Sequence, residues 1–398
     1  MMDAVKLAIA GGILLAGSLV AVALGALPLR ELAAVADRVA PILAFVVAIS
    51  VVAELATRAG VFDVAASWLA RLSRGRTWLL WLSVAGLSVV TTAFLSLDTT
   101  AVLLTPVVVA VARANGLPPL PFALTTIWLA NTGSLFLPIS NLTNLLAADR
   151  MPAGGPTAFA ALMAPSAVAA VLTTVLVLGV VHRRSLGGHY VVSDSPRIAD
   201  RVQLVGSSVI VVAVLPLLVS GLPPWIPAAG AALALTALFA WRAPRALSPR
   251  LIPWSLLVFA AGLFAAVAAA EALGSGRWIA AVAGTGSETA DVWRMAAAGL
   301  TAANDVDNLP AYLLLESTAH ETGRLPALLI GVNAGPLITP WASLATLLWH
   351  DRLRAVGVEV SRAASPCGDW SRPPSSSPHP SPHSSGSDPR GDVPPLGD

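Results

Sequence analysis

Two stretches of this chain repeat each other inside an otherwise apolar sequence. Residues 131–146 read NTGSLFLPISNLTNLL and residues 333–348 read NAGPLITPWASLATLL, with seven of sixteen positions identical at a constant offset of 202. Both stretches place Asn, Gly, Pro and hydroxyl residues where a membrane span should avoid them, because a helix broken in hydrocarbon must find new hydrogen-bond partners. Two matching broken segments, one in each half, indicate the binding site of a secondary transporter.

The composition favours a membrane protein. The chain is 56% hydrophobic and 12% charged, about half the charge of a typical soluble domain. Six apolar runs reach the roughly 20 residues needed to cross a bilayer, and the first of them lacks a signal-peptide cleavage pattern and is expected to be a retained span. The predicted spans are 5–27, 39–58, 157–181, 202–220, 225–241 and 252–272.

Several other classes of protein are not supported. The net charge of +2 gives no reason to expect a nucleic-acid partner. The only cysteine, Cys367, permits neither a disulfide within the chain nor a cysteine metal site. No catalytic triad, phosphate-binding loop or zinc-protease motif is present. We therefore expect no enzyme activity, no cofactor and no bound metal.

Arginine placement predicts the orientation in the membrane. With a cytoplasmic N-terminus, eleven arginines fall in the segments inside the cell and six in those outside, as the positive-inside rule requires. The inside segments are 59–77, 113–120, 182–201 and 242–251. The abundance of Arg and Ala suggests a GC-rich bacterial genome. The prediction is a multi-pass protein of a bacterial inner membrane, with its N-terminus and its tail in the cytoplasm.

The arginine count fits only if two interrupted apolar stretches each enter and leave the membrane on the same side. They are 78–112, interrupted by SLDTT at 96–100, and 294–316, interrupted by NDVDN at 304–308. We expect each to form a re-entrant hairpin, the first from the cytoplasm and the second from outside, so that the following broken segments cross in opposite directions. The predicted fold class is all-α integral membrane: a polytopic helical bundle of two inverted-topology repeats, each with a re-entrant hairpin and a broken helix.

The expected domain organisation follows from these elements. The segments are an N-terminal span 1–27, a first transport repeat 28–181, a cytoplasmic linker 182–201, a second transport repeat 202–361 and a tail 362–398. The tail is rich in Pro and Ser and is predicted to be disordered.

The first hairpin carries Asp98 near mid-membrane, where an ionised carboxylate costs about 3 kcal/mol. One interpretation is a proton or cation site, with Ser96, Thr99 and Thr100 as hydroxyl ligands. The alternative is a structural cap, in which Asp98 accepts backbone N–H bonds at the hairpin tip. Both interpretations can hold together.

The second hairpin gathers Asn304, Asp305, Asp307 and Asn308 within five residues. Carboxylates this close repel each other when both are ionised, which suits a group that exchanges a proton. The alternative is a wet loop at the membrane surface. Elsewhere, Glu54 and Glu271 lie near the ends of corresponding spans, where pairing with an arginine such as Arg58 is favoured over a place in a proton path.

The broken segments supply the remaining candidate ligands. Half-helices that begin after Pro138 and Pro340 would point the positive ends of their dipoles at the midplane. The alternative is a proline kink whose polar residues bond between helices, and the repetition weighs against it. The candidate binding residues are Asn131, Thr132, Gly133, Ser140, Asn141, Thr143 and Asn144 in the first break, and Asn333, Gly335, Thr339, Ser343 and Thr346 in the second.

These motifs resemble those of the arsenite permease family, the membrane subunit of arsenical pumps, within the wider ion transporter superfamily that includes the sodium-dicarboxylate symporters. The resemblance is carried by FLSLDTTAVLLTP (94–106), LANTGSLFLPISNLTNLL (129–146), NLP (308–310) and GVNAGPLITPWASLATLLW (331–349). It implies export of arsenite and antimonite in exchange for protons, with the solute held as a neutral hydroxide by hydrogen bonds that Asn, Ser and Thr groups can form. It also allows a soluble arsenite-stimulated ATPase and a homodimer as partners.

The chain departs from the resemblance at one point. Family members continue with a further membrane span after the segment that ends near 357–361, whereas in this chain a Pro/Ser-rich sequence follows. A defective or non-transporting product is therefore one alternative. Another is a sodium- or proton-coupled transporter of a dicarboxylate or other anion, although the acidic tips SLDTT and NDVDN suit an anion less well than the Ser-Asn-Thr tips of dicarboxylate carriers.

Overall fold

The computed structural model describes residues 2–151, 155–193, 198, 200–319, 323–339, 342–358 and 360. Helices account for the secondary structure of these residues, and the only β-type pairing among them is an isolated bridge between Arg76 and His189. The predicted all-α fold is confirmed. Pro340 and the tail 362–398, about which the sequence made predictions, lie outside the described residues.

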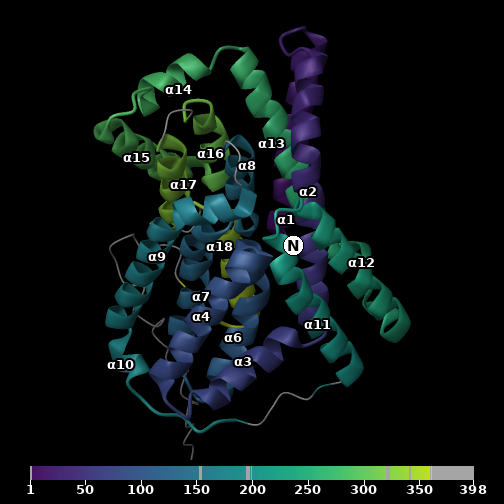
Figure 1. Ribbon diagram of the computed structural model, residues 1–398, viewed down its shortest axis with the longest axis vertical. Helices are drawn as coiled ribbons and strands as arrows, with labels where there is room; N and C mark the ends of the chain where they lie inside the picture. The colour runs from purple at the N-terminus through teal and green to yellow at the C-terminus, as the bar shows by residue number, and fades with distance from the viewer. Residues whose placement is uncertain are drawn as a thin grey trace, which may run out of the picture.

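The first half contains two long helices, a hairpin, a broken helix and a further long helix (Figure 1). Its α-helices are α1 (Met2–Ala23), α2 (Leu29–Arg58), α3 (Val61–Leu72), α4 (Thr77–Leu95), α5 (Leu97–Thr99), α6 (Thr105–Ala114), α7 (Pro119–Gly133), α8 (Leu142–Arg150) and α9 (Gly155–Val181). A π-helix, η1 (Thr100–Leu104), joins α5 to α6, and two 3-10 turns, η2 (Ser134–Phe136) and η3 (Pro138–Ser140), join α7 to α8.

The second half follows a similar order. Its α-helices are α10 (Arg183–Leu186), α11 (Arg201–Leu218), α12 (Trp225–Arg242), α13 (Trp254–Ala272), α14 (Gly276–Ala283), α15 (Thr289–Val306), α16 (Asn308–Glu316), α17 (Arg324–Ala334) and α18 (Leu344–Ala355). The 3-10 turns are η4 (Pro244–Ala246), η5 (Pro249–Leu251) and η6 (Gly335–Leu337).

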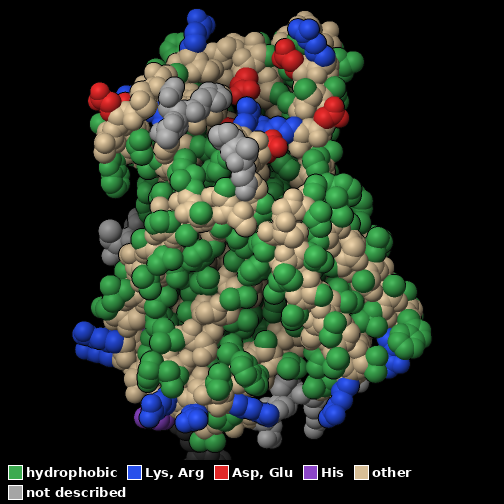
Figure 2. Space-filling model, in the orientation of Figure 1, with side chains coloured by type: hydrophobic (Ala, Val, Ile, Leu, Met, Phe, Trp, Pro, Cys, Tyr) green, Lys and Arg blue, Asp and Glu red, His purple; other side chains and the backbone are tan. Residues whose placement is uncertain are grey.

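Eight helical segments of the described chain are long and apolar enough to cross a membrane. Six overlap the predicted spans, although Leu29–Arg58 begins ten residues before the predicted start at 39, and the other two, Thr77–Leu95 and Leu97–Ala114, are the arms of the first hairpin. Figure 2 shows a broad hydrophobic belt between two charged ends, with basic side chains along the lower end and both signs of charge at the upper end. The protein is therefore a multi-pass membrane protein, as predicted.

The two broken helices end and begin again at corresponding places in the described part of the chain. In the first, α7 ends at Gly133, 3-10 turns follow, and Asn141 is the N-cap of α8. In the second, α17 ends at Ala334, a 3-10 turn follows, and Ser343 is the N-cap of α18. Asn141 and Ser343 are separated by the sequence offset of the repeat, so the repeat in sequence is also a repeat in backbone structure.

Each hairpin turns at a single residue with an unusual backbone conformation. Ser96 has φ 94° and ψ 157°, and Asp307 has φ 84° and ψ 156°. Non-glycine residues rarely adopt such values, which cost on the order of 1–3 kcal/mol each and are found mainly at functional sites. The two side chains support their turns in the same way: Ser96 Oγ accepts the N–H of Thr99 at 3.4 Å, and Asp307 Oδ1 accepts that of Leu309 at 3.2 Å.

The two hairpins lie at opposite ends of the molecule. In Figure 1, α4, α6 and α7 occupy the lower half and α15, α16 and α17 the upper half. This is the arrangement that inverted repeats would produce. Each arm of the first hairpin is long enough to cross a bilayer alone, so the re-entrant path and the inverted topology stay predictions.

The linker between the halves packs against the first half. Tyr190 is buried and its hydroxyl donates to the carbonyl of Ala70 at 2.6 Å. At its end, Asp200 is the N-cap of α11 and pairs with Arg242 at 2.8 Å. The N–H of Gln203 and the guanidinium of Arg242 lower the pKa of the Asp200 carboxyl.

Glycines allow α1 to pack closely on α13. A Cβ atom at Gly11 would lie 2.5 Å from the Cα of Phe259, and one at Gly262 would lie too close to the carbonyl oxygen of Gly11. We expect Gly11→Val to lower stability by about 1–3 kcal/mol, the usual cost of overpacking. Gly12→Val is the matched control on the same helix, because a Cβ there meets no atom within 4 Å. Thermal unfolding of the purified variants measures both, and equal losses would contradict the packing argument.

Candidate functional site

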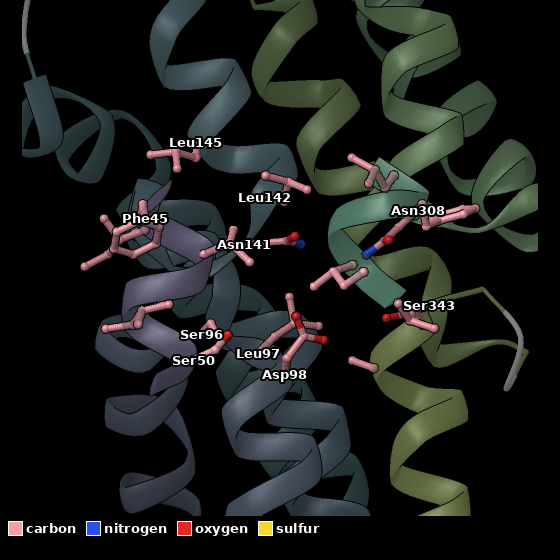
Figure 3. A pocket seen from close by; sticks show the side chains of 18 of the residues that line it. Phe45, Ser50, Ser96, Leu97, Asp98, Asn141, Leu142, Leu145, Asn308 and Ser343 are labelled. Atoms are coloured by element: carbon pink, nitrogen blue, oxygen red, sulfur yellow. The ribbon is translucent and has the colours of Figure 1, made fainter. Parts of the chain in front are cut away.

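The hairpin turns and the helix breaks of both halves line one cavity of about 60 Å³. The polar residues lining it that the sequence predicted as ligands are Ser96, Asp98 and Asn141 from the first half and Asp307, Asn308 and Ser343 from the second. Figure 3 shows the side chains of Asn141 and Asn308 directed toward each other across the cavity, with Asp98 directed into it from a third side. Since a buried water needs on the order of 10–15 Å³, the cavity suits a few waters or one small solute.

Three half-helices begin at this cavity. Their N-caps are Asn141 for α8, Asp307 for α16 and Ser343 for α18, and all three residues line it. Helix N-termini carry partial positive charge and unpaired N–H groups. The arrangement therefore offers hydrogen-bond donors to the oxygen atoms of a bound solute.

Two carboxylates face the same small space. Asp98 follows the turn at Ser96 and opens onto the cavity, and no residue of the described chain donates a hydrogen bond to its carboxylate. The capping role considered for Asp98 belongs to Ser96 instead. Asp307, on the opposite hairpin, has its Oδ1 bound to the N–H of Leu309. Two anionic groups at one cavity favour a neutral or protonated occupant, because like charges repel strongly away from water.

A larger space of about 530 Å³ leads away from Asp98. Ser96, Asp98 and Thr99, at and beside the hairpin turn, line this space, and its other charged residues are Lys6, Glu54 and Arg250. The sequence predicts that the segments around these three residues lie at the cytoplasmic end. We call this space the vestibule. Glu54 forms the predicted ion pair with Arg58 at 2.9 Å.

Asn333 joins the two breaks at the centre of the molecule. Its side chain is fully buried, and its Oδ1 accepts hydrogen bonds from Asn141 Nδ2 at 2.6 Å and Ser134 Oγ at 3.1 Å. Its Nδ2 donates to Asn144 Oδ1 at 3.1 Å and to the Leu329 carbonyl at 2.8 Å. Every hydrogen-bonding position of the amide is thus used inside the protein, and Asn333 does not line the cavity.

Other predicted ligands also lie away from the cavity. Those buried in or beside the breaks are Asn131, Thr132, Gly133, Ser140, Thr143, Asn144 and Thr346. Thr100 is also buried, and its hydroxyl forms a hydrogen bond of 2.8 Å with the hydroxyl of Thr92. In the second half, Asn304 donates to the carbonyl of Gly335 at 3.1 Å and accepts from Thr339 at 2.6 Å. Asp305 is exposed and lines neither space. These residues shape the site without facing it.

Two features of the site gave no signal in the sequence. Ser50 of α2 lines both the cavity and the vestibule, but it is one hydroxyl in a long apolar span. The π-helix Thr100–Leu104 begins two residues after Asp98, and such insertions in helices are frequent at functional sites. Within the described chain, no group of His, Cys, Asp and Glu could hold a metal ion.

An ion cluster ties three helices together at the other end of the site. Arg38 of α2 binds Glu316 of α16 through two contacts of 2.7 and 3.3 Å, and binds Asp149 of α8 at 2.9 Å. Arg150 lies 3.4 Å from Glu316, and the hydroxyl of Tyr312 donates to the same carboxylate at 3.0 Å. The sequence predicts these residues at the extracytoplasmic end, away from the vestibule.

Comparisons with known proteins agree with this architecture. The sequence profile of the citrate transporter family matches residues 4–346. An arsenical pump membrane protein of Yersinia enterocolitica is 30% identical over 342 residues, covering 79% of each chain. Two arsenical pump membrane proteins of Escherichia coli are each 28% identical, one over 84% of this chain and 83% of its own length, the other over 79% of both.

The helical architecture, the central cavity with polar residues from both halves, and these relatives define a membrane transporter rather than an enzyme. More specifically, the chain belongs to the citrate transporter family and is related to the arsenical pump membrane proteins. The resemblance found in the broken segments and the first hairpin is thereby confirmed.

Proposed function

We propose that the protein exports arsenite and antimonite as neutral trihydroxides, in exchange for protons, across a bacterial inner membrane with its N-terminus in the cytoplasm. The main support is the cavity of about 60 Å³, in which two carboxylates lie beside the amides of Asn141 and Asn308. Hydroxyl groups on a small neutral solute can both donate to carboxylates and accept from amides and helix N-termini. The relatives are arsenical pump membrane proteins, which supports the same substrate.

Binding through oxygen is required by the composition. The only cysteine, Cys367, lies in the tail, so thiolates of this chain cannot hold trivalent arsenic in the membrane. The proton would be carried by Asp98, Asp307 or both, since each can be neutralised when the substrate leaves. An arsenite-stimulated ATPase and a homodimer stay predictions of the resemblance.

One observation favours a second candidate, an anion such as citrate or a dicarboxylate. Lys6 and Arg250 line the vestibule, and three helix N-termini point at the cavity. Against this, a polycarboxylate would have to enter a small space beside Asp98 and Asp307. The mutual repulsion of carboxylates makes the neutral solute the better candidate.

Uptake into everted membrane vesicles tests the proposal. We expect vesicles containing the protein to accumulate arsenite when their interior is acidic, by up to about tenfold for each pH unit if one proton exchanges for one solute. Dissipating the proton gradient should remove the accumulation, and excess citrate should not compete. Citrate uptake in place of arsenite uptake would support the second candidate and exclude the first.

A further inference from the structure

The hydrogen bonds between the two breaks follow a two-fold pattern. Asn131 and Asn333 are equivalent in the repeat, as are Asn144 and Thr346. Asn333 Nδ2 donates to Asn144 at 3.1 Å, and Asn131 Nδ2 donates to Thr346 at 3.4 Å. The asparagine of each break therefore donates a hydrogen bond to the other break, and the two bonds join equivalent positions of the repeat.

The same pattern extends to the backbone of each helix. Asn131 Nδ2 donates to the carbonyl of Ile127 at 3.0 Å, and Asn333 Nδ2 donates to that of Leu329 at 2.8 Å. These acceptors are also equivalent in the repeat. The two asparagines are thus placed alike on α7 and α17, and differences between them reflect their partners rather than their own positions.

Those differences are confined to the oxygen atom of each amide. Asn333 Oδ1 accepts hydrogen bonds from Asn141 and Ser134. Asn131 Oδ1 is buried and has no hydrogen-bond partner among the described residues. A buried acceptor without a partner costs on the order of 1–3 kcal/mol, so this state holds one break tightly and leaves the other incompletely bonded.

The missing donor can be identified from the repeat. The equivalent of Ser134 is Pro336, which has no side-chain donor. The equivalent of Asn141 is Ser343, whose hydroxyl lines the cavity and does not cap α18. Ser343 is therefore the one residue of the repeat that can give Asn131 the bond that Asn141 gives Asn333.

We propose that Asn333 and Asn131 are positioning residues that hold the two breaks in turn: Asn333 accepts from Asn141 in the conformation described here, and Asn131 accepts from Ser343 in an opposite conformation. The exchange moves Asn141 and Ser343, which both line the cavity, without requiring either Asn131 or Asn333 to contact the solute. The inference rests on the proposed transport function only in requiring two conformations.

Chemical labelling of the vestibule measures the balance between the two conformations without any transport assay. The full-length protein would carry Cys367→Ser, to remove its natural thiol, and Val102→Cys, a reporter in the vestibule wall. Because Asn333 stabilises the state with an open vestibule, we expect Asn333→Leu to slow labelling by a thiol reagent roughly fivefold, the effect of one hydrogen bond of ordinary net strength.

The matched variants separate this role from general damage. Ser343→Ala removes a bond made only in the opposite state, so it should not slow labelling by itself and should restore the rate when combined with Asn333→Leu. Asn115→Leu also removes an amide bonded to the carbonyl four residues earlier, at 2.8 Å, but far from the breaks, and should leave the rate unchanged. Failure of Ser343→Ala to restore the rate, or no slowing in Asn333→Leu, would overturn the proposal.

A second measurement remains available if Asn333→Leu does not fold. In the Cys367→Ser background, Asn131→Cys combined with Ser343→Cys should become joined by an oxidant as the opposite conformation is visited. Asn131→Cys combined with Asn308→Cys is the control, since Asn308 lines the same cavity from another helix. No cross-link in the first pair, or equal cross-linking in both, contradicts the proposal. Loss of arsenite uptake alone would bear on the proposed function and not on this exchange.

Discussion

Replacing Asp98 with asparagine is expected to abolish proton-coupled arsenite transport while leaving the protein folded in the membrane. The side chains have nearly the same shape, and the carboxylate receives no hydrogen bond from the described residues that the change would break. Asparagine cannot bind and release a proton. Gradient-driven uptake should therefore fall to the level of vesicles that lack the protein, as uptake measurements with and without a proton gradient would show.

Asp305→Asn is the matched control for Asp98→Asn. It makes the same change of charge on the second hairpin, but Asp305 is exposed and lines neither the cavity nor the vestibule. Uptake by this variant should equal that of the unchanged protein. Uptake at the normal rate by Asp98→Asn, with its dependence on the proton gradient retained, would show that Asp98 has a structural role and that the proton is carried elsewhere.

The sequence predicted the location of the site through the repeat. The sequence predicted that half-helices begin after Pro138 and Pro340, and in the structure α8 begins at Leu142 and α18 at Leu344. The interrupted hairpins drew attention to Ser96, Asp98, Asp307 and Asn308, which all line the cavity, and their role in binding stays a prediction. Periodicity and composition carry this information because polar residues are costly in a membrane span unless something binds them. The same cost explains why five of the six spans could be located within a few residues, whereas α2 begins at Leu29, ten residues before the predicted start of the span 39–58.

The division of roles within the breaks could not be predicted. Asn141 and Asn333 have the same side chain and lie in matching stretches. Asn141 lines the cavity, whereas the amide of Asn333 forms four hydrogen bonds inside the protein. Which amide faces the solute depends on how α7 and α17 pack, and no local pattern reports that packing. Ser50 was missed for a related reason, since a single serine in an apolar helix has no distinguishing neighbours.

The second large effect is expected at Glu316. We expect Glu316→Gln to lower the free energy of unfolding by about 2–4 kcal/mol, because it leaves the half-buried guanidinium of Arg38 without its buried partner. Glu316 is 7% exposed, which makes its loss costly, while the retained contact of Arg38 with Asp149 limits the effect. Thermal or denaturant unfolding of the purified protein in detergent measures the change.

A double-mutant cycle isolates the contribution of the pair itself. Arg38→Gln combined with Glu316→Gln should be less destabilised than the sum of the single variants, with a coupling of about 1–3 kcal/mol. The control cycle uses Glu54 and Arg58, whose side chains are 30% and 33% exposed and lie one turn apart on α2. Such a pair should show a coupling of only about 0.3–0.5 kcal/mol. Equal couplings in the two cycles would show that burial gives the Arg38–Glu316 pair no special strength.

Because of its position, loss of the Arg38–Glu316 ion pair should also affect the cavity. Arg38 lies on α2, which lines the cavity with Phe45 and Ser50, and Glu316 ends α16, which begins at the cavity with Asn308. The ion pair therefore joins two walls of the cavity at one end, on the side away from the vestibule. If it holds that end closed, Glu316→Gln should increase the reactivity of a cysteine introduced at Leu142, a cavity residue on α8, toward a reagent added from outside. An unchanged reactivity alongside lowered stability would limit the pair to holding the fold together.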